Sequence, residues 1–98
     1  MERRVYITID HLDDLFGPVY LRVGDELKIK KEHDNCYDDE AIAVFKKENK
    51  CAYVANSVRT VARGTFSAGR IYDLIGEKGE CVVRFILEDK AIAEVLKG

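Results

Sequence analysis

The sequence predicts a mainly β domain: a small, partly open barrel of six short strands with a short helical insertion and a C-terminal helix. The first observation is a series of short runs in which apolar and polar residues alternate, as half-buried strands require. The second is the close spacing of these runs, which are separated by turn-forming residues. The third is the scarcity of helical segments, which leaves too few crossovers for a parallel sheet. The length and the hydrophobic content of 47% suit one domain, residues 1–98, with its own core.

Three strands are predicted in the first third of the chain, over residues 4–10, 19–23 and 27–30. In the first of them Val5, Ile7 and Ile9 share one face, while the residues between them are mostly polar. The third runs into a polar block, residues 33–40, which contains several turn-forming side chains. We expect this block to form the most polar loop of the protein.

Three more strands are predicted over residues 41–45, 51–55 and 81–87, and the first two are arranged as a hairpin. A helical insertion is expected between the hairpin and the last strand. Its two helices are predicted over residues 58–63 and 68–75, each after a residue that can cap it and before a glycine that can end it. A closing helix that begins near Asp89 is predicted from the helical spacing of four apolar residues, Ala91, Ile92, Val95 and Leu96.

Composition excludes several functional classes. A net charge of −2 and a pI near 5.7 argue against a protein that coats nucleic acid through overall basicity. The three cysteines lack CxxC spacing and are odd in number, so we expect reduced thiols and neither a disulfide framework nor a zinc site. No apolar run approaches the roughly 18 residues of a membrane-spanning helix, so we expect a cytoplasmic protein with no membrane association.

The sequence also lacks the common catalytic and metal-binding motifs. Neither a phosphate-binding GxxxxGKS run nor a GxGxxG run occurs, and the acidic cluster of residues 34–40 does not have the spacing of a calcium loop. We therefore expect no metal, no cofactor and no enzymatic activity. The least favoured alternative is a small nucleic-acid hydrolase whose metal is gathered by these acidic residues.

One window of the chain has the composition of an anion-binding surface. No Asp or Glu occurs over residues 49–72, a stretch that contains Lys50, Arg59 and Arg63 together with aromatic residues. Cationic side chains satisfy phosphate oxygens and exposed rings stack on unpaired bases, so these three cations are candidates for a phosphate path. The alternative is that the aromatic residues belong to the core and the arginines form a solvated helix face.

A sequence motif lies within residues 24–55. Its matched positions are Asn35, Tyr37, Asp38, Ala41, Ile42 and Val44, followed by Ala52-Tyr53-Val54. In this order and spacing the segment resembles the HIRAN family, whose pattern reads Asn-Pro-Tyr-Asp, a short gap, Ala-Ile-x-Val and then Gly-(His/Tyr)-(Ile/Val/Leu). Cys36 stands in place of the proline and Ala52 in place of the strand glycine. The chain resembles a small stand-alone bacterial branch of that family, without an attached helicase domain.

The resemblance implies an OB-like barrel that binds DNA, and in the best-known members the ligand is a single-stranded 3′ end at a remodelled replication fork. The implied partners are single-stranded DNA or a DNA 3′ end, together with a repair or helicase-type protein. On the matched positions, Tyr37 offers a ring for stacking on the terminal base and Tyr53 is the second aromatic. Asp38 can accept a hydrogen bond from the 3′ hydroxyl, and Asn35 can bind a base edge or hold the loop.

Two alternatives stay open. Asn35 and Asp38 are ordinary turn formers, and Tyr37 can serve as a lid on the barrel. The whole chain can also act as a protein-interaction or adaptor module that does not bind DNA. The favoured hypothesis is a non-enzymatic nucleic-acid-binding module with the candidate residues Asn35, Tyr37, Asp38, Tyr53, Lys50, Arg59 and Arg63.

Overall fold

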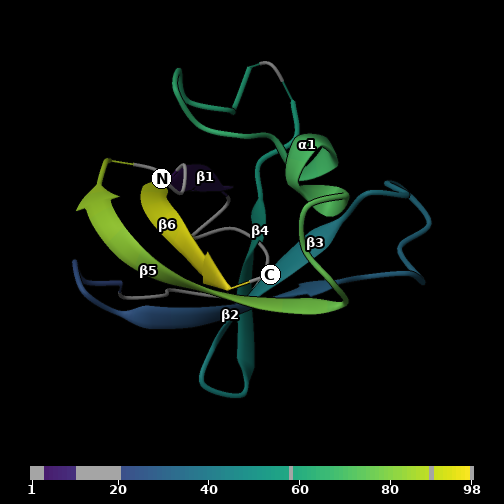
Figure 1. The fold of residues 1–98 in the computed structure, drawn as a ribbon, viewed down its shortest axis with the longest axis horizontal. Coiled ribbons are helices and arrows are strands. Elements are labelled where there is room, and N and C mark those ends of the chain that lie inside the picture. The colour runs from purple at the N-terminus through teal and green to yellow at the C-terminus, as the bar shows by residue number, and fades with distance from the viewer. Residues whose placement is uncertain (1–3, 11–20, 58, 89, 98) are drawn as a thin grey trace.

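The computed structural model describes residues 4–10, 21–57, 59–88 and 90–97, which form a closed antiparallel barrel of six strands with one short helix (Figure 1). The elements are β1 (Val5–Asp10), β2 (Glu26–Lys31), β3 (Ile42–Lys46), β4 (Asn49–Val54), α1 (Ala68–Tyr72), β5 (Lys78–Ile86) and β6 (Ala91–Lys97). Around the barrel the order is β1-β4-β3-β2-β5-β6, and β6 pairs with β1 to close it. The mainly β class is confirmed, and the barrel is consistent with a small OB-like fold.

Five of the predicted strands correspond to β1, β2, β3, β4 and β5, with small shifts at their ends. The alternation is clearest in β2, where Leu27 and Ile29 are fully buried while Lys28 and Lys30 are exposed. The predicted hairpin is the β3–β4 pair, and Lys47 occupies its turn.

The predicted C-terminal helix is wrong, because its residues form β6. Ala91 and Ala93 are fully buried and Val95 packs on the core, so alternate residues face inward. This short apolar run fits both periods, and periodicity alone does not separate a strand from a helix at that length. Strand pairing prevails because β1 and β5 each need a partner for their backbone N–H and C=O groups. The same pairing closes a barrel that the sequence predicts as partly open.

The predicted second strand is wrong over its described part. Residues 21–22 belong to no strand, and Val23 and Gly24 form a turn in which Gly24 has a φ of 96°. Glycine adopts this left-handed conformation without steric cost. The turn is held by the N–H of Gly24, which donates to the carbonyl of Val83 at 2.7 Å. Residues 19–20 of the same prediction lie outside the described residues.

Of the two helices predicted after the hairpin, only the second forms. Residues 59–63 lie in turns and bends instead, and Val58 lies outside the described residues. In α1 the side chain of Ser67 is the N-cap, and its Oγ accepts the N–H of Arg70 at 3.2 Å. The helix is shorter than predicted, because the chain must turn back after it to enter β5.

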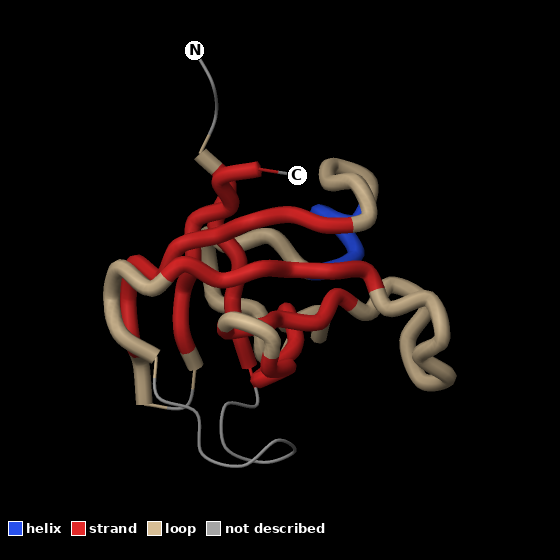
Figure 2. The backbone as a smooth tube through the Cα atoms, turned by 90° about the horizontal axis from the view of Figure 1, so that it is seen from below, coloured by secondary structure: helices blue, strands red, loops and turns tan. Residues whose placement is uncertain are grey.

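The core fills the inside of the barrel and includes the buried face of α1. Its largest fully buried aliphatic side chains are Ile7, Ile9, Leu27, Ile29, Ile42, Val44, Val83 and Ile71. The tube view shows the strands curling into the barrel, while the loop between β2 and β3, residues 32–41, projects away from it (Figure 2). This loop carries three of the candidate site residues.

Candidate nucleic-acid interface

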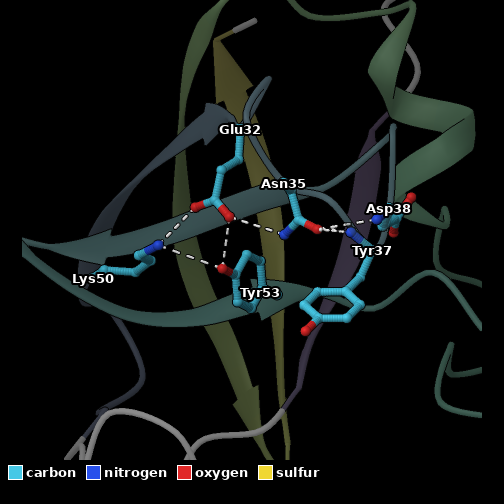
Figure 3. A network of polar contacts seen from close by, with 6 residues as sticks. All are labelled: Glu32, Asn35, Tyr37, Asp38, Lys50 and Tyr53. Carbon is cyan, nitrogen blue, oxygen red and sulfur yellow. Dashed lines mark hydrogen bonds and ion pairs between the residues drawn. The ribbon is translucent and has the colours of Figure 1, made fainter.

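The β2–β3 loop, residues 32–41, is held in shape by its own side chains (Figure 3). Oδ1 of Asn35 accepts hydrogen bonds from the backbone N–H groups of Tyr37, at 2.8 Å, and Asp38, at 3.0 Å. Nδ2 of the same amide donates to Oε1 of Glu32 at 2.9 Å. Asn side chains favour such turns because they replace a backbone partner. Of the two roles that the sequence leaves open for Asn35, the geometry matches the one that holds the loop.

This turn presents the ring of Tyr37 to solvent. Tyr37 is 94% exposed, and its ring lies apart from the polar contacts drawn around it (Figure 3). Burial of apolar surface is favourable by about 25 cal/mol per Å², so a tyrosine that the fold leaves this open gains nothing from the core. The role of Tyr37 as a lid on the barrel is therefore wrong.

Asp38 connects the loop to β4 and α1. Its Oδ1 accepts the N–H of Glu40 at 2.9 Å, and its Oδ2 accepts Nδ2 of Asn56 at 3.2 Å. Asn56 follows β4 closely, and its Oδ1 accepts the N–H of Gly69 in α1 at 2.8 Å. The position of the loop is thus coupled to two other elements. Each oxygen of the carboxylate also keeps a lone pair for a further donor.

Glu32 is the centre of the polar network (Figure 3). Its Oε2 accepts a hydrogen bond from Nζ of Lys50 at 2.7 Å, and its Oε1 accepts one from the hydroxyl of Tyr53 at 2.7 Å. Nζ of Lys50 also donates to the hydroxyl of Tyr53 at 3.4 Å. Because Asn35 donates to the same carboxylate, Glu32 joins the β2–β3 loop to β4.

The network has a definite charge state at neutral pH. Burial alone would raise the pKa of Glu32, but hydrogen bonds from Lys50, Tyr53 and Asn35 outweigh it and hold the pKa below its ordinary value. The hydrogen bond to Glu32 raises the pKa of Lys50, and burial together with the same carboxylate raises the pKa of Tyr53. Glu32 and Lys50 are therefore an ion pair in which the two charges balance. Lys50 adds little net positive charge to a phosphate path.

The two arginines predicted for the phosphate path lie on another segment, between β4 and α1. Thr8 of β1 fixes this segment, because its fully buried Oγ1 accepts the N–H of Ala62 at 3.0 Å. Arg59 and Arg63 are exposed there. In Figure 1 this segment and the β2–β3 loop lie on different sides of α1. Arg59 and Arg63 therefore belong to a different segment from the β2–β3 loop.

The other aromatic residues of the acid-free window serve the core. Phe66 and Tyr72 are half-buried and pack against the core cluster. Their rings are also covered by cations: the guanidinium of Arg70 lies 4.2 Å from the ring centroid of Phe66, and the ammonium of Lys31 lies 4.3 Å from that of Tyr72. The core alternative is confirmed for these two residues.

Thiol and metal-ligating side chains do not gather into a site in the described part of the chain. No group of three or more His, Cys, Asp or Glu residues there is placed to hold a metal ion. Cys36 is exposed, whereas Cys51 and Cys81 are buried, and all three are free thiols. Burial, with a smaller effect from Cys51, raises the pKa of Cys81 to about 12, so this thiol stays protonated at neutral pH. None of the described helices has the length and apolar character needed to cross a membrane.

Sequence reasoning missed Glu32 and Asn56, on which the shape of the loop depends. A weak signal exists for Glu32, which is the acidic member of the basic-acidic pair before the motif. The pairing of Ala43 with Tyr53 carries the Tyr53 side chain toward the end of β2, where Glu32 lies. That pairing joins distant parts of the chain, so no local pattern reveals it.

Comparisons of the chain with protein-family models, with curated proteins and with solved structures return no match. The geometry of the β2–β3 loop and the motif in the sequence are therefore the features that bear on function.

Proposed function

We propose that this chain is a non-enzymatic module that binds single-stranded DNA at a free 3′ end through the β2–β3 loop. The observation that carries the proposal is the exposure of Tyr37. This residue is 94% exposed and lies on a loop that hydrogen bonds of Asn35 and Glu32 hold in shape. Stacking of a base on such a ring contributes about 1–3 kcal/mol. A braced loop also loses little conformational freedom on binding, which favours affinity.

Asp38, next to this ring, supplies selectivity for the strand end. Its carboxylate can accept a hydrogen bond from a terminal 3′ hydroxyl, a donor that internal nucleotides lack. A terminal 3′ phosphate would instead place an anion against the carboxylate and be repelled. The existing hydrogen bonds from Glu40 and Asn56 hold Asp38 in position for this contact.

The electrostatics around the loop predict a modest affinity for an anionic ligand, because Asp34, Asp38, Asp39 and Glu40 lie on it. Glu32, which accepts a hydrogen bond from Asn35, has its charge balanced by Lys50 at 2.7 Å. Tyr53, the second aromatic of the site, is oriented by its hydrogen bond to the same carboxylate. The proposal assigns no contact with the terminal nucleotide to Arg59 and Arg63, which lie on the separate segment.

The resemblance of the motif to the HIRAN family supports the same ligand. Four matched positions, Asn35, Tyr37, Asp38 and Tyr53, are ones that the fold brings into a single network. Processing of DNA ends in repair or at replication forks is accordingly the role in which we place this module.

Fluorescence anisotropy with a labelled oligonucleotide tests the proposal. A strand with a free 3′ hydroxyl should bind more tightly than the same strand with a 3′ phosphate, and the affinity for both should fall as salt is raised. Equal affinity for the two strands would contradict end recognition. Metal-dependent cleavage in the same samples would indicate the hydrolase instead.

A protein-interaction module is the second candidate, and a specific surface favours it. Phe85 and Leu87 are exposed at the end of β5, and with Tyr6 and Ile92 they line a hollow of about 350 Å³. Exposed apolar side chains that lie together are typical of protein contacts. Negligible binding of both oligonucleotides would favour this candidate over DNA binding.

A further inference from the structure

The outer face of β2 carries lysines that the proposed function does not use. The buried side chains of β2 alternate with Lys28 and Lys30, which face outward. In the sheet, Lys28 lies opposite Phe45 of β3, and Lys30 lies opposite Lys78 of β5. Cations from two strands therefore meet on one face of the barrel, beside a half-buried aromatic ring.

This face is hollowed. A depression of about 540 Å³ is lined by Lys28, Lys30, Phe45, Lys47, Lys78 and Glu80, and we refer to it as the lysine hollow. Its described charged side chains are four lysines and one glutamate, whereas the whole chain has a net charge of −2. Like charges in one hollow repel one another, and an anionic ligand would relieve that repulsion.

Lys47 reaches the lysine hollow from an unusual backbone conformation. Lys47 occupies the β3–β4 turn with a φ of 58°. Among the described residues other than glycine, it alone has a positive φ. Residues with a β-carbon pay a steric cost there, which Gly avoids. Lys47 therefore lines the lysine hollow from a backbone conformation that glycine would adopt at lower cost.

The lysine hollow adjoins a second depression on the side of the proposed end-binding site. This second depression of about 330 Å³ shares Lys30 and Phe45 with it and extends to Glu32, whose carboxylate holds Asn35 and Tyr53. The acidic groups of this second depression are Asp34 and Glu32, and the latter is paired with Lys50. The two depressions therefore lie side by side on the outer face of β2 and β3.

We propose that the lysine hollow binds the backbone phosphates of the nucleotides on the 5′ side of the terminus, with Phe45 available to a base. The direction of the strand rests on the proposed function, since a 3′ end held at Tyr37 leaves only the 5′ side to continue. Lysines bind phosphates as compact point charges, and a ring among them is the combination found in single-strand binding grooves. This combination favours a nucleic acid over an acidic peptide, which offers no bases to the ring.

Length dependence tests the proposal. The wild-type protein should bind a strand of twelve thymidines more tightly than one of four, because only the longer strand reaches the lysine hollow. The double variant Lys28→Gln/Lys78→Gln should weaken twelve-mer binding several-fold and leave four-mer binding unchanged. The slope of log affinity against log salt should become shallower by about 0.7 for each phosphate that the variant no longer neutralises. Lys90→Gln, just beyond the far end of β5, is the matched control and should leave both affinities unchanged.

Lys47→Gly separates a binding role from a folding role. Glycine removes the charge and suits the positive φ, so the melting temperature should stay the same or rise while twelve-mer affinity falls. A fall in both the melting temperature and the affinity would mean that Lys47 acts through the turn, and would remove it from the lysine hollow.

Strands blocked with a 3′ phosphate distinguish failure of this inference from failure of the proposed function. If the wild type binds blocked and free twelve-mers with equal affinity and the lysine variants weaken both, the lysine hollow binds phosphates and end recognition fails. If the free 3′ hydroxyl is preferred but the double variant changes neither twelve-mer affinity nor its salt dependence, the hollow plays no part in DNA binding. Tighter binding of a twelve-residue glutamate peptide than of the twelve-mer would also overturn the inference.

Discussion

The hydroxyl of Tyr53 donates a 2.7 Å hydrogen bond to the carboxylate of Glu32, although β3 lies between β4, which carries Tyr53, and β2, which Glu32 follows. The register places Ala43 of β3 between Lys30 and Tyr53. Ala43 shares the outward direction of its partner Lys30, yet it is only 2% exposed. The bond therefore passes over a small residue, and the polar network covers the outer face of β3 at this point.

Replacement of Glu32 should destabilise the protein. Glu32→Gln removes the ion pair with Lys50 and sets an amide donor against an ammonium group. Hydrogen bonds to charged groups contribute about 1.5–3 kcal/mol, and partial exposure of the pair reduces this, so we expect a loss of about 1–2 kcal/mol in the free energy of unfolding. Urea denaturation measures it. Glu48→Gln, at an exposed turn position, is the control, and equal effects of the two variants would contradict the role of Glu32.

The contribution of Glu32 should also depend on pH. Its pKa in the folded protein lies below the ordinary value of 4.5, so its stabilising effect is complete above that value and is lost as pH falls through the folded pKa. The difference in unfolding free energy between the wild type and Glu32→Gln should therefore be largest near neutral pH and shrink below about pH 4.5. Denaturation of both proteins over a series of pH values measures this, and a constant difference would exclude linkage to Glu32.

A larger residue at position 43 should disturb the hydrogen bond between Glu32 and Tyr53. Ala43→Val places two extra methyl groups under the Glu32–Tyr53 bond, where overpacking typically costs about 1–3 kcal/mol. Valine is a better strand former than alanine, so propensity alone predicts the opposite sign. Thermal denaturation decides between them, and a rise in melting temperature would mean that the bond does not constrain position 43.

Tyr37 should matter for binding and not for folding. Because it is 94% exposed, Tyr37→Ala should change the free energy of unfolding by less than about 0.5 kcal/mol. The Tyr37→Ala variant should lose about 1–3 kcal/mol of binding free energy for single-stranded DNA, because the stacking contact is lost. Tyr37→Phe keeps the ring and should bind as the wild type does. Anisotropy titrations that show identical affinities for all three proteins would remove Tyr37 from the interface.

Local patterns were sufficient for most of the barrel. Alternation predicts β1 and β2, and short apolar runs between turn-forming residues predict β3, β4 and β5. Ser67 likewise marked the start of α1, since a cap is a local interaction. The sequence predicts a helix for the short run that forms β6 because its apolar residues fit either period, and only pairing with β1 and β5 decides for a strand.

The residues of the candidate site also divide into those that local patterns reveal and those that only the folded barrel reveals. The sequence by itself determined the polar loop and its motif, and with them Asn35, Tyr37 and Asp38, because these residues act on neighbours a few positions away. Tertiary structure alone decided that Glu32 and Lys50 neutralise each other and that Asn56 holds Asp38. Such contacts depend on strand order and register, which are set by closure of the whole barrel and leave no trace in any short segment.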